Sequence, residues 1–121
     1  MKKVMTVLIS GPYRSGSGND PVLIEANLRK MEDAALILFR AGHIPFIGEW
    51  LSVPLLKVSG SKKTGDHHDK ELLYPVAARL ISKCDAILRL PGESKGADED
   101  VRIARQHNIP VYFKLTDILS T

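Results

Sequence analysis

The sequence has a single cysteine, no long apolar run and no dense block of basic residues, and each scarcity excludes a class of protein. Because Cys84 has no partner in the chain, an internal disulfide framework is excluded, which is typical of a reducing cytoplasm. No apolar stretch is long enough to span a bilayer, and Met1–Lys3 leads into a predicted strand rather than a secretion signal. We therefore predict a cytoplasmic protein without a membrane partner.

The chain also has little net charge. The chain has 17 Lys and Arg residues against 14 Asp and Glu residues, a formal net charge of +3, and this weak balance argues against nucleic acid as a partner. Hydrophobic residues make up 44% of the 121 residues and charged residues 26%, which is ordinary for a globular domain with its own core. Residues 1–121 are therefore predicted to form one domain.

Apolar runs alternate with helical patterns along the chain. Runs rich in β-branched residues predict four strands, at residues 4–10, 44–47, 86–90 and 109–114. Apolar residues at helical spacing predict helices at residues 21–41 and 51–58, from Asp66 or Asp69 to residue 83, and at residues 97–107 and 116–119. Asp20 is the predicted cap of the first helix, because Pro21 follows it. The alternation predicts a flavodoxin-like or Rossmann-like α/β three-layer sandwich, with a parallel sheet of four to five strands.

Loops that follow parallel strands open on one edge of the sheet, where such folds bind ligands. We expect this carboxyl edge to collect residues suited to an anionic ligand that carries a ring. The helix before the third strand runs back across the sheet, so its N-terminus, with His67, His68 and Asp69, is expected there too. The candidate binding residues in the loops are Gly11, Tyr13, Arg14, Glu49, Trp50, Ser94 and Gly96.

Several of these residues also have a structural explanation. Arg14 suits a clamp on a phosphate or carboxylate, and equally a structural ion pair. Tyr13 and Trp50 suit stacking on a ligand ring, or packing in the loop, the core or a subunit interface. Glu49 suits a hydrogen bond to a ribose hydroxyl, or capping of the helix that follows it. The residue types alone leave these alternatives open.

Familiar cofactor motifs are incomplete. Gly11 and Gly16 have the spacing of a phosphate-binding P-loop, but Ser17–Gly18 occupies the place of the required Lys-Ser/Thr pair. The same segment begins like a dinucleotide-binding motif, but Pro21 stands where its third glycine belongs. The adjacent residues at 67–69 seldom converge on one ion, so no metal is predicted. We expect a protein without a cofactor.

Three consecutive carboxylates, Asp98, Glu99 and Asp100, open the helix after the third predicted strand. Acidic residues in a first turn interact favourably with the helix dipole, which is a sufficient structural explanation. Crowded carboxylates also suit acid–base chemistry, because repulsion between like charges keeps one group protonated while another is ionised. The residues alone do not decide between these two roles.

Two segments resemble a known family. Leu8–Arg14 (LISGPYR) and Ser94–Asp100 (SKGADED) are similar to the first-strand and nucleophile motifs of the nucleoside 2-deoxyribosyltransferase-like superfamily. That group includes deoxynucleoside monophosphate N-glycosidases and smaller relatives, and the resemblance covers most of the chain in order and spacing. It implies a flavodoxin-like sheet, a homo-oligomer (dimer or tetramer), no metal, and cleavage or transfer at the N-glycosidic bond of a nucleoside or nucleotide.

In that superfamily a Ser-x-Gly-x-x-x-Glu motif carries the nucleophile, and the matching positions here are Ser94, Gly96 and Asp100. Asp is one methylene shorter than Glu, and Glu99 points about 100° away around a helix. The resemblance implies that Asp100 is the nucleophile and that the acid for the leaving base is Asp69 or Asp98. It also implies that Arg14, Ser94 and Gly96 hold the phosphate or sugar.

The shorter acid at position 100 leaves two further functions open. One is a nucleotide-binding or sensing module that keeps the pocket and has lost catalysis. The other is a ribonucleotide phosphoribohydrolase, whose Pro-Gly-Gly-x-Gly-Thr-x-x-Glu motif is partly matched by Pro91–Asp100. Here the spacing from Pro91 to Gly96 is one residue longer and Ala97 replaces the Thr, so this alternative ranks last.

Overall fold

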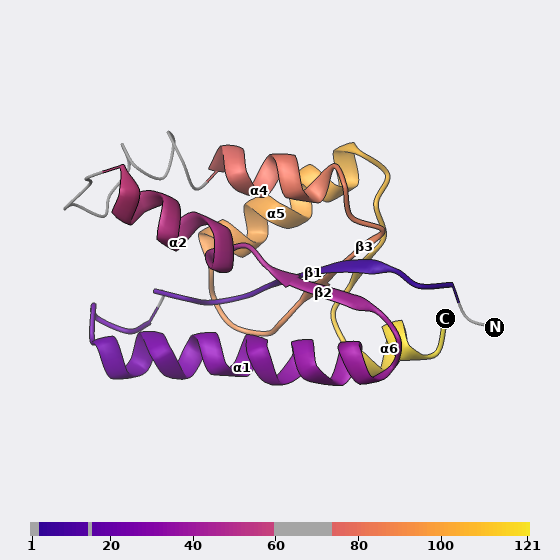
Figure 1. Ribbon diagram of the computed structural model, residues 1–121, viewed down its shortest axis with the longest axis horizontal. Helices are drawn as coiled ribbons and strands as arrows, with labels where there is room; N and C mark the ends of the chain where they lie inside the picture. The colour runs from indigo at the N-terminus through magenta and orange to yellow at the C-terminus, as the bar shows by residue number, and fades with distance from the viewer. Residues whose placement is uncertain (1–2, 15, 60–73) are drawn as a thin grey trace.

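The computed structural model describes residues 3–14, 16–59 and 74–121, and helices and strands alternate along them (Figure 1). The order of elements is β1 (Thr6–Ser10), α1 (Pro21–Arg40), β2 (Ile44–Ile47), α2 (Glu49–Val58), α4 (Tyr74–Ile81), β3 (Ala86–Arg89), α5 (Lys95–Gln106), β4 (Val111–Tyr112) and α6 (Leu115–Leu119). No helix among the described residues is long and apolar enough to cross a membrane.

The four strands form one parallel sheet in the order β2-β1-β3-β4. This confirms the predicted α/β fold, with four strands in the described part of the chain. The internal strand β1 pairs with β2 and β3, in registers that place Ile9 beside Ile47 and Ser10 beside Arg89. From β1 the chain first runs to β2 on one side, then crosses back to β3 on the other side of β1 and continues to β4. The strand order therefore reverses between β1 and β3. Open sheets of this kind bind ligands at the carboxyl ends of such a pair of strands.

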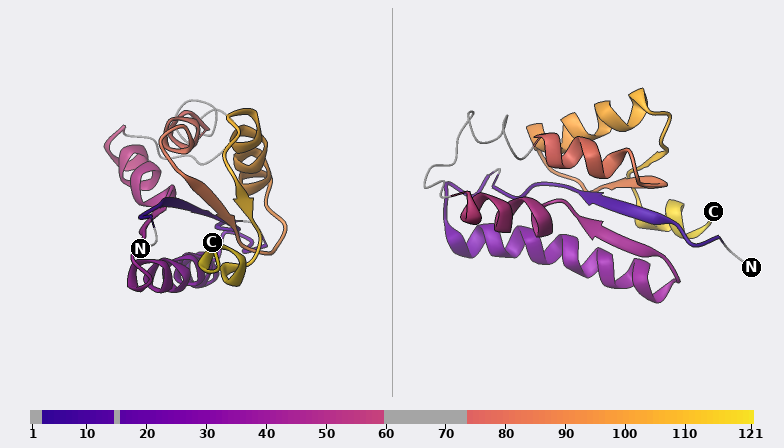
Figure 2. Two further views of the ribbon diagram at one scale, coloured as in Figure 1. Left: turned by 90° about the vertical axis from the view of Figure 1, so that its right-hand side faces the viewer. Right: turned by 45° about the horizontal axis from the view of Figure 1, so that its top comes forward.

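Helices cover both faces of the sheet: α1 and α6 lie on one face, and α2, α4 and α5 lie on the other (Figure 2). Side chains of β1 alternate between the two layers, because successive residues of a strand point to opposite faces. Val7 and Ile9 belong to the core with α1, whereas Leu8 belongs to the core with α4 and α5. By the same alternation, Ser10 of β1 and Arg89 of β3 face the α5 layer.

Several predicted boundaries are confirmed. Asp20 caps α1, since its Oδ1 accepts a hydrogen bond from the Val22 N–H at 2.9 Å. Strand β2 spans the predicted residues and lies at an edge of the sheet, which suits Pro45 because proline lacks an N–H. The predicted start of the helix before β3, at Asp66 or Asp69, lies outside the described residues.

Other predicted boundaries were wrong by one or two residues, among them those of β4, α5 and α2. Strand β4 is limited to two residues, Val111 and Tyr112, because Pro110 has no N–H to donate and its carbonyl alone bonds to Ile87. Helix α5 begins at Lys95 instead of residue 97, because the Ser94 side chain caps it. Helix α2 begins at Glu49 instead of residue 51, directly after β2.

Polar side chains at the amino edge of the sheet have structural partners. Nδ1 of His43 accepts a hydrogen bond from the Met5 N–H at 3.2 Å, and Oδ2 of Asp85 accepts one from the Thr6 N–H at 2.8 Å. Burial, reinforced by the charge of Asp85, raises the pKa of the Cys84 thiol to about 11. This thiol stays protonated at neutral pH, as expected of an inert buried cysteine.

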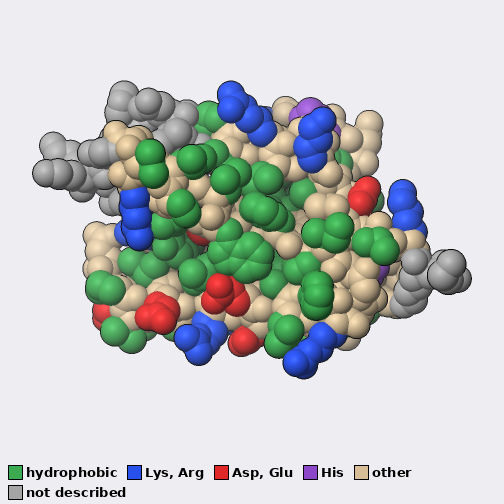
Figure 3. All heavy atoms as spheres, in the orientation of Figure 1, with side chains coloured by type: hydrophobic (Ala, Val, Ile, Leu, Met, Phe, Trp, Pro, Cys, Tyr) green, Lys and Arg blue, Asp and Glu red, His purple; other side chains and the backbone are tan. Residues whose placement is uncertain are grey.

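One face of the molecule is apolar. Figure 3 shows hydrophobic side chains gathered over α2, β2 and α1, with acidic and basic side chains along the border of this area. The exposed hydrophobic side chains on these three elements include Leu36, Ile44, Trp50, Leu51 and Leu55. Strand β2 has no neighbour on its outer side among the described residues. We call this area, on the outer side of β2, the β2 face.

The loops after β1 and β3 pack closely at Gly92. This residue has a φ of +119°, and a Cβ there would lie 2.7 Å from Cγ of Pro12. We expect Gly92→Ala to lower the free energy of unfolding by about 1–3 kcal/mol, because both the backbone and the proline ring must shift. Urea denaturation measures this change.

The matched control is Gly48→Ala, at a position with helical backbone angles and no atom within 4 Å of the added Cβ. We expect this control to change stability by less than about 0.5 kcal/mol. Equal losses in the two variants would contradict the role of the Gly92 contact.

Candidate active site

A hydrogen bond joins the end of β1 to α5 at the carboxyl edge of the sheet. The Ser10 hydroxyl donates to Oδ2 of Asp100 at 2.6 Å. Ser10 is 3% exposed and Asp100 is partly buried, so solvent competes little for this bond. The bond fixes the carboxyl group of Asp100 above the carboxyl ends of β1 and β3.

Arg89 supplies a buried positive charge beside this bond. It pairs with Ser10 across the β1–β3 register and is 7% exposed. Its Nη2 donates to Oδ1 of Asp98 at 2.8 Å, and its Nη1 donates to the carbonyl of Leu90. The side chain of Asp98 is 73% exposed. Asp98 therefore holds Arg89 from the rim of the site, while the positive charge of Arg89 favours the ionised form of Asp100.

The N-terminus of α5 is capped by Ser94, whose Oγ accepts a hydrogen bond from the Ala97 N–H at 3.1 Å. Ser94 is buried, whereas Lys95 and Gly96 in the first turn are exposed. The first N–H groups of a helix have no acceptor within the helix, and the helix dipole adds partial positive charge there. This end of α5 is therefore suited to an anion beside Asp100.

Opposing effects set the protonation of Asp100. Burial raises its pKa most strongly, and the negative charge of Glu99 raises it further. The hydrogen bond from Ser10 and the charge of Arg89 lower it, and the balance leaves the pKa at about 6. At pH 7 or above, the group is therefore mostly an ionised carboxylate in a partly desolvated position, as a nucleophile requires.

Glu49 is a second carboxyl group with a raised pKa at the same edge. It is the first residue of α2, two positions after the β2 residue Ile47 that pairs with β1. Burial raises the pKa of Glu49 to about 7, the charge of Asp100 contributes to this rise, and the backbone N–H of Glu49 opposes it. Two neighbouring carboxyl groups that titrate at different pH are the arrangement used for paired acid and base roles.

The structure does not bring Tyr13 and Trp50 to Asp100, because their contacts lie with α1 on the other side of the sheet. The guanidinium of Arg14 lies 5.6 Å from the centre of the Tyr13 ring, and the Tyr13 carbonyl accepts a hydrogen bond from Asn27. The exposed indole of Trp50 donates to Glu32 at 3.2 Å. It also contacts Phe46 edge to face, with ring centres 5.9 Å apart. These contacts give Arg14, Tyr13 and Trp50 structural partners in the absence of a ligand.

Gly11 is buried where β1 ends, and a Cβ there would lie 3.1 Å from Cβ of Leu90. Glu99, the neighbour of Asp100, points to its own ion pair with Arg102. Asp69, predicted as one of two possible acids, lies outside the described residues. Among the described residues, no group of three or more His, Cys, Asp and Glu side chains lies close enough to hold a metal ion.

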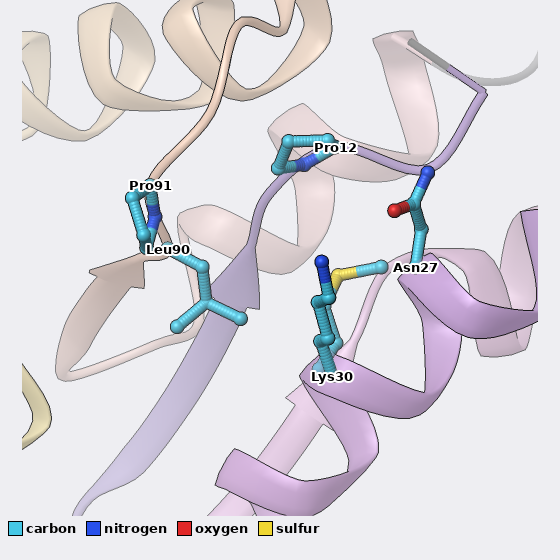
Figure 4. A pocket seen from close by; sticks show the side chains of 6 residues that line it. Pro12, Asn27, Lys30, Leu90 and Pro91 are labelled. Carbon is cyan, nitrogen blue, oxygen red and sulfur yellow. The ribbon is translucent and has the colours of Figure 1, made fainter. Parts of the chain in front are cut away.

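A cavity of about 270 Å³ lies near these loops, on the α1 face (Figure 4). Its apolar walls are Pro12, Met31, Leu90 and Pro91, and Asn27 and Lys30 extend into it from α1. Asp100 lies on the opposite face of the sheet, with the ends of β1 and β3 between the two. The residues that line the cavity include no pair of carboxyl groups such as Asp100 and Glu49, so the Asp100 side is the candidate active site.

Sequence reasoning missed Ser10 and Arg89 as members of the site. Both are polar residues at the last position of an otherwise apolar strand. Ser10 and Arg89 lie two positions after Leu8 and Ile87, which belong to the core with α5. Residues two apart in a strand face the same side, and this signal would have placed both on the Asp100 side. Their contact with Asp100 depends on strand register and helix packing, which the pattern of residues does not specify.

The sequence matches no protein-family model and no curated protein at a significant level. Among solved structures, the chain is similar to a 2-deoxyribosyltransferase from the psychrotolerant bacterium Bacillus psychrosaccharolyticus. The TM-score is 0.65 at 14% sequence identity, over 96% of this chain and 91% of that one. The two proteins therefore share a fold along nearly their whole length.

The raised pKa of Asp100 has a consequence for stability. An aspartate in an unfolded chain titrates near pH 3.8, and folding raises this pKa to about 6. Between these two values the unfolded state has lost its proton while the folded state keeps it, so stability falls as pH rises from about 4 to about 6. We expect Asp100→Asn to remove this loss, because its amide oxygen still accepts from Ser10.

At pH 7.5 the variant is expected to be more stable than the wild type by about 1–3 kcal/mol, with the difference shrinking toward pH 4. Urea denaturation at several pH values measures it. A difference that does not vary with pH would contradict the burial-raised pKa.

Proposed function

We propose that this protein cleaves, or transfers the sugar of, the N-glycosidic bond of a nucleoside or its 5′-monophosphate, with Asp100 as the nucleophile. The observation that carries the proposal is the hydrogen bond from Ser10 to Asp100 at the carboxyl edge of the sheet, beside the second carboxyl group of Glu49. The shared fold with a 2-deoxyribosyltransferase supports the same class of reaction. Enzymes that retain configuration at a sugar carbon use two such carboxyl groups.

The proposed reaction proceeds in two displacements. An oxygen of Asp100 attacks the anomeric carbon of the sugar, and the bond from that carbon to the base nitrogen breaks with its electron pair on the base. A water molecule, or the nitrogen of another base, then attacks the same carbon and returns the electron pair to the Asp100 carboxylate. Ser10 engages Oδ2, and Oδ1 accepts no hydrogen bond within the described residues, so Oδ1 is the oxygen available for attack.

The proposed anion site is the first turn of α5. Gly96 has no atom within 4 Å of an added Cβ, so a phosphate can approach its backbone N–H. The Ser94 hydroxyl accepts from Ala97 and keeps its own proton to donate to the ligand. Arg14 is proposed as a further phosphate contact, and Tyr13 as a ring contact for the base or sugar.

A second candidate function is a nucleotide-binding module without catalysis. It is favoured by the short side chain at position 100, which Ser10 holds against the end of β1. Binding without release of free base distinguishes this candidate from an enzyme. Release from ribonucleoside monophosphates alone would instead favour the phosphoribohydrolase alternative.

We further propose that the working form is a homo-oligomer in which a second copy covers the β2 face. Its exposed apolar residues and the unpaired outer edge of β2 support this proposal. Charges of both signs along the border of the face suit pairing with an identical copy about a two-fold axis. A monomer at micromolar concentration would contradict this part of the proposal.

The test of the proposed reaction is release of free base, measured by chromatography, from deoxynucleosides, ribonucleosides and their monophosphates. We expect Asp100→Asn to lower the rate on the best substrate by at least about 10³-fold, because an amide cannot act as the nucleophile. The loss cannot be ascribed to unfolding if the variant is at least as stable as the wild type at the pH of the assay.

The matched control is Glu99→Gln, which removes the neighbouring charge that pairs with Arg102. This control is expected to stay within about threefold of the wild-type rate, because a glutamine at an exposed ion pair disturbs the site little. Base release that survives in Asp100→Asn would contradict the proposed nucleophile. No release from any substrate, together with a thermal shift from one of them, would support the binding module instead.

A further inference from the structure

Glu49 lies where a proton donor for the leaving base is needed. Ile9 of β1 pairs with Ile47 of β2, so the next residues, Ser10 and Gly48, lie at the same level on adjacent strands. Glu49 follows Gly48 as the first residue of α2, on the same side of the sheet as α5. Adjacent strands are about 5 Å apart, and the charge of Asp100 acts on Glu49, so the two carboxyl groups are neighbours at this edge of the sheet.

The acids beside Asp100 on α5 are engaged by arginines. Asp98 accepts from the buried guanidinium of Arg89, and its side chain is largely exposed at the rim. Glu99 accepts from Arg102, and this interaction lowers its pKa. A carboxylate held by a guanidinium is stabilised in its ionised form and is a poor proton donor.

Glu49 has a different environment. Among the described residues, no Lys, Arg or His forms an ion pair with it, and the charged group that acts on it is Asp100 of α5. Its remaining partner is its own backbone N–H. The nearest cation of the site, Arg89 on β3, is engaged with Asp98 and Leu90. Glu49 is therefore the described carboxyl group best placed to hold a proton beside an ionised Asp100.

We propose that Glu49 is the general acid and base of the site: its carboxyl group protonates the departing base and then takes the proton of the attacking water. This proposal rests on the proposed function and assigns to Glu49 the role that the sequence left between Asp69 and Asp98.

In the first displacement, Asp100 forms a bond to the anomeric carbon while the bond to the base breaks, and the base nitrogen takes the proton of Glu49. In the second, Glu49 takes a proton from water, the water oxygen bonds to the anomeric carbon, and the bond to Asp100 breaks. The enzyme ends with the proton back on Glu49 and the negative charge back on Asp100.

The coupling between the two carboxyl groups suits this change of role. Burial and the negative charge of Asp100 raise the pKa of Glu49 to about 7, so a large share of Glu49 is protonated at neutral pH while Asp100 is mostly ionised. Once Asp100 is esterified by the sugar, its negative charge is gone. The pKa of Glu49 then falls, which favours the carboxylate that accepts a proton from water.

The experiment compares two leaving groups on the same sugar: the natural base, which needs a proton to depart, and 4-nitrophenolate, which departs as a stable anion. We expect Glu49→Gln to lower kcat/KM for the natural substrate by about 10²–10⁴-fold, the usual contribution of a general acid. For the 4-nitrophenyl glycoside the expected loss in the first displacement, measured as the burst of nitrophenolate, is less than about tenfold.

The pH profile is a second readout. For the natural substrate, wild-type kcat/KM is expected to fall above about pH 7, where Glu49 loses its proton, and this limb is expected to disappear in Glu49→Gln. The control Asp98→Asn removes the rim carboxylate and is expected to give no preference for the activated leaving group. Denaturation of each variant with urea establishes that it is folded.

Asp100→Asn separates the two proposals, because it is expected to lose activity on both substrates. Suppose that Asp100→Asn is inactive, and that Glu49→Gln either loses the same activity on both substrates or loses activity on neither. The role of Glu49 is then overturned while the proposed function stands. Selective loss in Asp69→Asn or Asp98→Asn, in place of Glu49→Gln, would also overturn it. If Asp100→Asn keeps wild-type activity, or the wild type cleaves neither substrate, the proposed function fails and this inference fails with it.

Discussion

The pairing of β1 with both β2 and β3 is the constraint on which the rest of the structure depends. It makes β1 an internal strand of the described sheet and places the carboxyl ends of three strands side by side. Ser10, Arg89 and Glu49 reach one edge of the sheet only because these registers align their strands. The hydrogen bond from Ser10 then ties α5, and with it Asp100, to this edge.

The two carboxyl groups of the site illustrate how one environment produces two protonation states. Both are removed from water, which raises both pKa values. Asp100 also receives a hydrogen bond from Ser10 and the field of Arg89, which favour its ionised form, whereas Glu49 lies beside a negative charge. The neighbours of these two groups therefore favour an ionised Asp100 beside a protonated Glu49, at a cost in stability that buried carboxylates bring at neutral pH.

Local physical chemistry explains which parts of this molecule were predictable from sequence. The cap at Asp20, the edge strand that contains Pro45 and the parallel α/β alternation depend on neighbouring residues or on periodicity, and the structure confirms them. The contact of Ser10 with Asp100 joins residues 90 positions apart, so it depends on packing that no local pattern specifies. Likewise, the ion pair between Arg89 and Asp98 was not predicted, because it depends on how α5 packs against β3.

The most direct test of a carboxylate nucleophile is to trap the sugar on the enzyme. A nucleoside with fluorine at the 2′ position slows hydrolysis of the glycosyl ester, because fluorine destabilises the oxocarbenium-like transition state. After incubation, intact-protein mass spectrometry is expected to show a gain of one fluorosugar, mapped by peptide analysis to Asp100 and absent from Asp100→Asn. Base release with no adduct at Asp100, or an adduct on another residue, would contradict the account.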